Sequence, residues 1–184
     1  MSVIFGAIVN GKLAIGCDSK SSEDNLLFPA GEKLTWHKIH KIGDAYVGHV
    51  GNSQYHTVLE NLAANHANIF DFTDQLTIHQ SFNRAQQLLV GDYGLVPQGD
   101  DFSGSGLNLL IAANGKLYSV DPERGVDEYA RFWAVGSGTM FALGAAEALY
   151  PNAQTAEKLV EDVIRVACKY DLHSLEPIHV VSAG

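Results

Sequence analysis

The sequence predicts an α+β fold in which two stacked β-sheets lie between two layers of helices, a four-layer αββα sandwich. Two observations favour this fold class. Apolar, β-branched runs come in pairs joined by short turn signals, as in antiparallel hairpins. Segments with a helical spacing of apolar residues also come in two pairs, so the order along the chain is strands, two helices, strands, two helices, strand. Each helix pair can then cover the outer face of one sheet.

The first half of the chain is expected to contain two hairpins followed by two helices. Asn10-Gly11 is the clearest turn signal, because both residues accept the positive φ angles of a type I′ turn, and Gly43-Asp44 has a similar composition. The triplet Gly51-Asn52-Ser53 ends the second hairpin and caps a helix, and Thr73 or Asp74 caps the next one. The expected strands cover Val3–Val9, 12–18, Leu26–Phe28, 38–42 and Ala45–Val50, and the expected helices cover 53–65 and 74–89.

The second half repeats this order after a loop. Residues 91–106 are dense in Gly and Asp, which predicts a loop, and Asn114-Gly115 predicts a third hairpin turn. Gly136-Ser137-Gly138 ends a short strand, and in the last helix Leu159 and Val163 share one apolar face. The expected strands cover 107–112, Lys116–Val120, 131–135 and 178–182, and the expected helices cover 140–149 and 155–169.

Length and composition predict one globular domain, 1–184. The chain is 46% hydrophobic and 18% charged, which is ordinary for a folded protein. Its net charge of −9 argues against a nucleic-acid partner, which would require basic residues. The N-terminus lacks the regions of a secretory signal peptide, and no stretch is long enough to span a membrane. Cys17 and Cys168 lack metal-binding or redox spacing and are expected to be free thiols, which fits a cytoplasmic protein.

Metal and cofactor chemistry is not predicted. The chain has eight histidines, but His37 and His40 are three apart in an expected strand region and therefore point to opposite faces. No H-x-x-x-H pair with a companion acid occurs, and the glycine-rich stretch GSGTMFALG has no lysine to hold a phosphate. We therefore expect neither a metal nor a cofactor.

The start of the chain points to nucleophilic chemistry. The sequence opens MSVIFGAIVNGKLAIGCDSK, and removal of Met1 would leave Ser2 with a hydroxyl and a free α-amine on one residue. An α-amine has an ordinary pKa of roughly 7.7–8.0, so near neutral pH it can act as the general base for its own hydroxyl. No G-x-S-x-G motif offers another serine nucleophile.

Four segments together resemble the proteasome β-subunit family, in particular bacterial proteins of the HslV type. They are SVIFGAIVNGKLAIGCDSK, KIHKIGDAYVGHVGN, AVGSGTMFALGAAEALY and DLHSLEPIHVV, and the resemblance covers essentially the whole chain. It implies the N-terminal nucleophile hydrolase fold. The family's nucleophile is usually threonine, so serine at this position is a departure.

The resemblance also implies roles for individual residues. Ser2 would be the nucleophile, Lys38 the cation beside it and Asp18 the acid that holds Lys38. The backbone N–H of Gly48 would bind the oxyanion. The hydrogen-bonding shell of the terminal amine would be formed by Ser137, Asp171 and Ser174, and the substrate side chain would be bound near Tyr46 and Val47.

Taken singly, these residues have ordinary alternatives. Asp18 at a strand end is typical of a turn, and Lys38 of a solvated strand. Ser137 is equally a helix cap, Asp171 equally a surface acid and Tyr46 equally a core residue. Only their joint match to one pattern favours the catalytic interpretation.

The leading hypothesis is a peptidase that cleaves peptides or unfolded proteins through an acyl-enzyme on Ser2. The resemblance implies a homo-oligomeric double ring with an internal chamber, and it allows an ATPase unfoldase as partner. Two alternatives stay open: a catalytically inert ring subunit, which retention of Met1 would favour, and an amidase of the same fold that acts on small amides.

Overall fold

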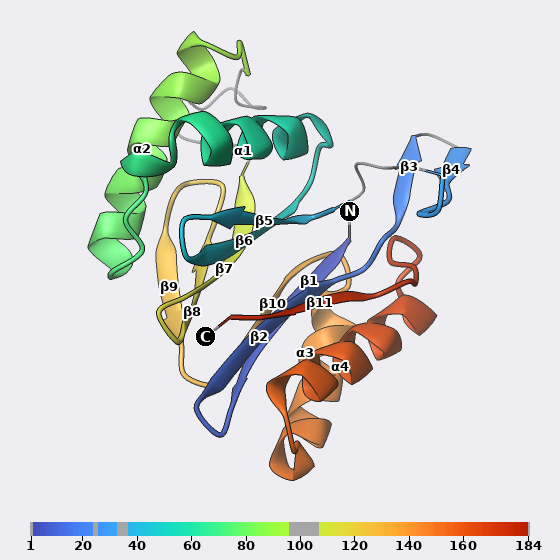
Figure 1. The fold of residues 1–184 in the computed structure, drawn as a ribbon. Coiled ribbons are helices and arrows are strands. Elements are labelled where there is room, and N and C mark those ends of the chain that lie inside the picture. The colour runs from blue at the N-terminus through green and yellow to red at the C-terminus, as the bar shows by residue number, and fades with distance from the viewer. Residues whose placement is uncertain (1, 24–25, 33–36, 96–106, 184) are drawn as a thin grey trace.

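The computed structural model describes residues 2–23, 26–32, 37–95 and 107–183, and it confirms the four-layer αββα sandwich. Helices α1 and α2 cover a five-stranded sheet, and α3 and α4 cover a four-stranded sheet that packs against the first (Figure 1). Part of the expected loop 91–106 lies outside these ranges. Within them, no helix is long and apolar enough to cross a membrane.

The four-stranded sheet carries the start of the chain in its interior. Its strand order is β10-β1-β2-β11, and all neighbours are antiparallel. β1 and β2 are joined by Asn10-Gly11, whose φ angles of 51° and 74° give the expected type I′ turn. The strands are β1 (Val3–Val9), β2 (Lys12–Cys17), β10 (Phe132–Gly136) and β11 (His179–Ser182).

The five-stranded sheet follows the chain order β5-β6-β7-β8-β9. The turn between β5 and β6 differs from the expected type I′, because Gly43 has a φ of 60° but Asp44 is not in the positive-φ region. This is the pattern of a type II′ turn, in which only the first residue must tolerate positive φ. The strands are β5 (Ile39–Ile42), β6 (Ala45–Val50), β7 (Asn108–Ala113), β8 (Lys116–Val120) and β9 (Val126–Tyr129).

The helices begin close to the expected positions. The Asp74 side chain accepts a hydrogen bond from the N–H of Thr77 and forms a capping box at the start of α2. At α1 the side chain of Asn52, and not that of Ser53, accepts from the N–H of Gln54. The helices are α1 (Gln54–Asn65), α2 (Gln75–Gly91), α3 (Thr139–Leu149) and α4 (Ala156–Tyr170), with short 3-10 turns at Ala67–Ile69 and Tyr150–Asn152.

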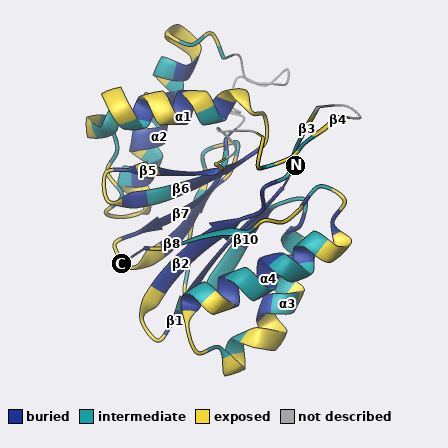
Figure 2. Ribbon diagram, turned by 45° about the vertical axis from the view of Figure 1, so that its right-hand side comes forward, coloured by how far each residue is buried: buried dark blue, intermediate teal, exposed yellow. Residues whose placement is uncertain are grey.

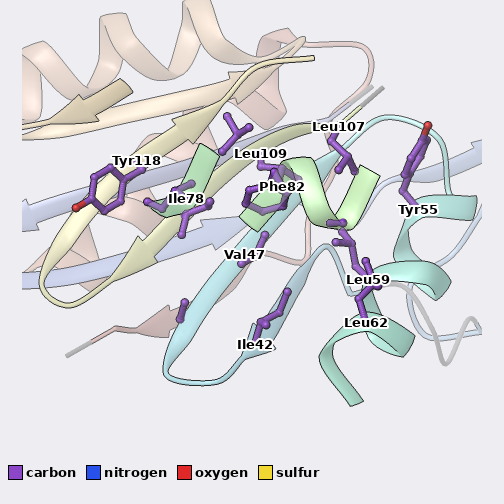
Figure 3. Close-up of a cluster of buried hydrophobic side chains, with 14 of the residues drawn as sticks. Ile42, Val47, Tyr55, Leu59, Leu62, Ile78, Phe82, Leu107, Leu109 and Tyr118 are labelled. Carbon is purple, nitrogen blue, oxygen red and sulfur yellow. The ribbon is translucent and has the colours of Figure 1, made fainter. Parts of the chain in front are cut away.

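Three apolar clusters hold the layers together. One lies between the five-stranded sheet and α1 and α2, where Val47, Leu59 and Phe82 pack (Figure 3). The second joins the four-stranded sheet to α3 and α4, and the third lies between the sheets. The sheets are accordingly buried on both faces, whereas the helices expose their outer faces (Figure 2).

Two short elements were not expected from the sequence. β3 (Ser21–Glu23) pairs with the expected strand β4 (Leu26–Phe28) in a separate two-stranded sheet. β9 extends the five-stranded sheet, although its sequence VDEY contains no apolar run. Both are polar edge segments, for which hydrophobic periodicity gives little signal.

Candidate active site

Three strand ends bring the first candidate residues together. Ser2 immediately precedes β1, Asp18 immediately follows β2 and Lys38 immediately precedes β5. Because β1 and β2 are antiparallel neighbours, the start of β1 lies beside the end of β2. The packing of the two sheets places the start of β5 beside these strand ends. Ser2, Asp18 and Lys38 therefore meet there, although 16 and then 20 positions separate them along the chain.

Ser2, Lys38 and Asp18 form one buried hydrogen-bonded chain. The Lys38 Nζ atom donates to Ser2 Oγ at 2.7 Å and to Asp18 Oδ1 at 2.7 Å. Ser2 and Lys38 are each 5% exposed, and Asp18 is completely buried. A cation this close to a serine hydroxyl favours the ionised oxygen, and the carboxylate offsets the cost of burying the lysine charge.

Asp18 is held by four donors and therefore has little freedom to move. Besides Lys38, its Oδ1 accepts from the N–H of Val3 at 3.0 Å. Its Oδ2 accepts from the N–H groups of Lys20 at 2.9 Å and Leu175 at 3.2 Å. Asp18 is thus not a solvated turn residue: it joins the start of β1, the lysine and the segment after α4.

A second network surrounds the main chain of Ser2. Asp171 Oδ2 accepts from the hydroxyls of Ser137 at 2.8 Å and Ser174 at 2.6 Å, and Ser137 Oγ also lies 3.3 Å from the Ser2 carbonyl oxygen. Burial works against the ionised form of Asp171, yet hydrogen bonds from Ser174, Ser137 and the N–H of His173 lower the pKa of the carboxyl. Asp171 is therefore not a free surface acid, and Ser137 does not cap α3 with its side chain.

Gly136 allows the close approach between this network and Ser2. Its φ is 103°, and a Cβ atom there would lie 2.1 Å from the Ser2 carbonyl oxygen. The same Cβ would lie 3.2 Å from Cγ1 of Val50, the last residue of β6. The C-terminal end of β6 and Ser2 therefore flank one glycine. Sequence reasoning assigned no role to Gly136 or to the N–H of Leu175, because neither contributes a functional side chain.

Gly48 lies in the middle of β6 and not at this end. It is paired with Ile39 of β5 and with Leu110 of β7. The N–H of His49 donates to the Lys38 carbonyl on the β5 side at 2.9 Å. Because successive N–H groups of a strand point to opposite sides, the N–H of Gly48 is directed toward β7. The oxyanion role expected for Gly48 stays a prediction.

The absence of a side chain at Gly48 has a packing reason instead. A Cβ there would lie 2.8 Å from Cγ2 of Ile4 in the opposite sheet. The first residue after β6 is Gly51, with a φ of 135°.

The structure does not bring Tyr46 and Val47 to Ser2. Val47 is completely buried and faces α1 and α2 (Figure 3). Tyr46 lies near the start of β6, four residues before the end that approaches Ser2. It borders a cavity of about 440 Å³ that the hairpin turns at Asp44 and Asn114 also line. The alternative for Tyr46, a packing role, fits this placement better than substrate binding does.

The described residues contain no group of three or more metal-ligating side chains arranged to hold an ion. Cys17 and Cys168 are free, and burial raises the pKa of each thiol to about 12. Thiolate chemistry at neutral pH is therefore not supported at either position.

Comparison with known proteins identifies several similar folds. A sequence model of the family described as "Proteasome subunit" matches residues 2–182. The structure is similar to that of Thiobacillus denitrificans BPH, with a TM-score of 0.90 and 25% identity over 98% of this chain and 96% of that chain. For the same protein in complex with Epoxomicin, the TM-score is 0.88 at 24% identity, covering 98% and 97% of the two chains. Eukaryotic HslV from Trypanosoma brucei has a TM-score of 0.71 and 20% identity over 98% of both chains. No curated protein sequence matches.

Proposed function

Because the chain belongs to the proteasome subunit family, we propose that it is a peptidase with Ser2 as its nucleophile. The observation that carries this proposal is the buried contact of 2.7 Å between Lys38 Nζ and Ser2 Oγ, backed by Asp18 at 2.7 Å. A lysine held by a carboxylate against a hydroxyl at the start of the chain is the arrangement that activation of an N-terminal serine requires.

The proposed reaction begins with removal of Met1, which frees the α-amine of Ser2. The neutral amine takes the proton from Ser2 Oγ as the oxygen attacks the substrate carbonyl, and Lys38 stabilises the negative charge that develops on Oγ. The carbon–nitrogen bond of the substrate then breaks, and the departing amine receives the proton. Water hydrolyses the acyl ester and restores the serine. In this scheme Ser137, Ser174 and Asp171 orient the amine.

For the oxyanion we propose the N–H of Gly51 as the donor in place of that of Gly48. Gly51 follows Val50, whose side chain lies near the glycine that contacts Ser2. Gly51 is beyond the last paired residue of β6 and takes no part in the ladder with β7. An oxyanion donor must point at the reacting carbonyl, and the loss of one typically slows the reaction by about 10²–10³-fold.

A substitution of Ser2 tests the proposal. Wild-type protein should hydrolyse unstructured fluorogenic peptides, and Ser2→Ala should abolish the activity while retaining the fold. Ser53→Ala is the matched control, since Ser53 makes no side-chain cap bond at α1. Equal peptidase activity in wild type and Ser2→Ala would rule the proposal out. Activity on small amides with none on peptides would identify an amidase instead.

The burial of Ser2 favours a second candidate, a catalytically inert ring subunit. Ser2 is only 5% exposed as a residue. An inert subunit should retain Met1 and should show no hydrolysis of any peptide or amide. The N-terminal sequence of the protein from its natural host separates this candidate from the peptidase.

We further propose that the chain assembles into a homo-oligomeric double ring, which would enclose the nucleophile and admit only peptides or unfolded chains. An exposed apolar surface supports a subunit contact. It lies where the start of α3 is beside the end of α4. Phe141 and Tyr170 stack there with ring centroids 5.9 Å apart. The exposed side chains are Met140, Phe141, Tyr170 and Leu172. Light scattering should report a large oligomer, and a stable monomer at micromolar concentration would refute the ring. An ATPase partner and a cytoplasmic location are what the family implies.

A further inference from the structure

Three histidine side chains lie close together near Lys38, on the face of the five-stranded sheet that the helices cover. His40 comes from β5, His49 from β6 and His56 from α1. His49 is completely buried and His40 is 6% exposed. The proposed reaction uses none of them.

The three rings contact one another directly. His40 Nε2 and His56 Nδ1 are 3.2 Å apart and share one hydrogen bond. The ring of His49 lies edge-on to that of His56, with centroids 5.1 Å apart, and also contacts Tyr55 at 5.3 Å. Among the described residues, neither ring nitrogen of His49 has a hydrogen-bond partner. A proton added to His49 would therefore create an unpaired charge in a buried site.

The charged groups near the cluster lie at its outer edge. His40 lines an open pocket of about 410 Å³ with His37, Lys41 and the exposed Glu60. Burial and the neighbouring His37 lower the pKa of His40 to about 4. Burial, followed by the charges of His56, His40 and the N-terminal amine, lowers the pKa of His49 well below its usual range. His40 and His49 are thus neutral when the cluster is closed.

The cluster is joined to Lys38 through the main chain. The N–H of His49 donates to the carbonyl of Lys38 at 2.9 Å, and His40 lies two residues after Lys38. If the cluster opens, β5 separates from β6 and α1, and the Lys38 backbone loses this hydrogen bond. Asp18 still contacts Lys38 Nζ, but the main chain of Lys38 then no longer fixes the position of the side chain against Ser2 Oγ.

We propose that His40, His49 and His56 form a proton-sensitive support that positions Lys38 only while the imidazoles are neutral, so that mild acid reversibly releases the lysine. The catalytic consequence rests on the proposed function, in which Lys38 acts on Ser2. The structural step, acid-induced opening of the segment around Lys38, does not depend on that function.

Hydrogen exchange measures this opening directly. An imidazole that is neutral when closed and titrates near its ordinary value of about 6.5 when open raises the opening equilibrium about tenfold per pH unit below 6.5. With His40 and His49 both contributing, the protection of amides in residues 38–50 should fall about 100-fold between pH 7.5 and 5.5, after correction for intrinsic rates.

Variants at His49 show whether this histidine causes the fall in amide protection. His49→Phe and the smaller His49→Leu should each remove about tenfold of this fall, while His66→Gln, a control at the end of α1 outside the cluster, should leave it unchanged. Peptide hydrolysis at pH 5.5 relative to pH 8.0 should rise in the same variants. A fall in protection that is the same in wild type and both His49 variants, or no fall at all, would overturn the proposal. Absence of peptidase activity at every pH, with the expected exchange pattern, would count against the proposed function alone.

Discussion

Replacement of Asp18 by Asn should be the most damaging conservative change in the site. The asparagine oxygen can still accept from Lys38 Nζ and the Val3 N–H, as Oδ1 does now. The NH2 group would then face the N–H groups of Lys20 and Leu175, which at present donate to Oδ2. Two buried donors lose their acceptor, and the lysine loses its counter-charge.

The size of the effect follows from these contacts. Breaking a buried ion pair by removing one partner costs about 3–5 kcal/mol, and each unsatisfied N–H costs about 1–3 kcal/mol. The terms overlap because Lys38 can deprotonate and the amide can rotate, so we expect a loss of about 3–5 kcal/mol. Domains of this kind have a free energy of unfolding of about 5–15 kcal/mol. The variant should therefore fold, but with a small remaining free energy of unfolding.

Urea unfolding at pH 7.5 and matched protomer concentration measures this loss. The double variant Asp18→Asn/Lys38→Met removes the unpaired charge and should be more stable than Asp18→Asn alone. Glu128→Gln is the control, because its partner Lys116 is 3.4 Å away in an exposed pair that should contribute little. A stability of Asp18→Asn within about 1 kcal/mol of wild type, or a double variant no more stable than the single one, would contradict this prediction.

Three further predictions test other parts of the site. Gly48→Ala should cost about 1–3 kcal/mol of stability, because its Cβ would lie 2.8 Å from Ile4 Cγ2, but should retain kcat; full stability with lost activity would return the oxyanion role to Gly48. Ser137→Ala should lower kcat by about 10- to 100-fold by removing the hydrogen bond to Asp171, and unchanged kinetics would contradict the proposed shell. Thermal unfolding should show a stability that is constant above pH 6.5 and falls toward pH 4, because the folded pKa of His40 is about 4 against an ordinary value of about 6.5. His40 alone should account for about 3 kcal/mol at pH 4, and an unchanged Tm across this range would contradict its burial in the neutral form.

The fold was predictable because its signals are local. Asn10-Gly11 and Asn114-Gly115 both adopt the positive φ angles that their composition predicts. The type I′ turn expected at Gly43-Asp44 was wrong, since Gly43 alone supplies the single positive φ that a type II′ turn needs. β9 was missed because the segment VDEY forms a strand by pairing with β8, and its own sequence gives no signal for this tertiary contact.

The site was predictable only in part, because its geometry depends on where strands end. Gly48 and Gly51 are three residues apart, and the sequence does not reveal which one lies beyond the last pair of the ladder. The contacts among His40, His49 and His56 could not be predicted, since they appear only once α1 is packed on β5 and β6. The N–H of Leu175, which holds Asp18, has no side-chain signal at all.

The most direct test of the central claim is the intact mass of the protein after treatment with a peptide epoxyketone such as epoxomicin, a reagent that requires both a free α-amine and the adjacent hydroxyl. The account predicts a chain that lacks Met1 and carries one inhibitor on Ser2, with no adduct on Ser2→Ala and an unchanged adduct on Ser53→Ala. A chain that lacks Met1 and remains unmodified at saturating inhibitor would contradict it.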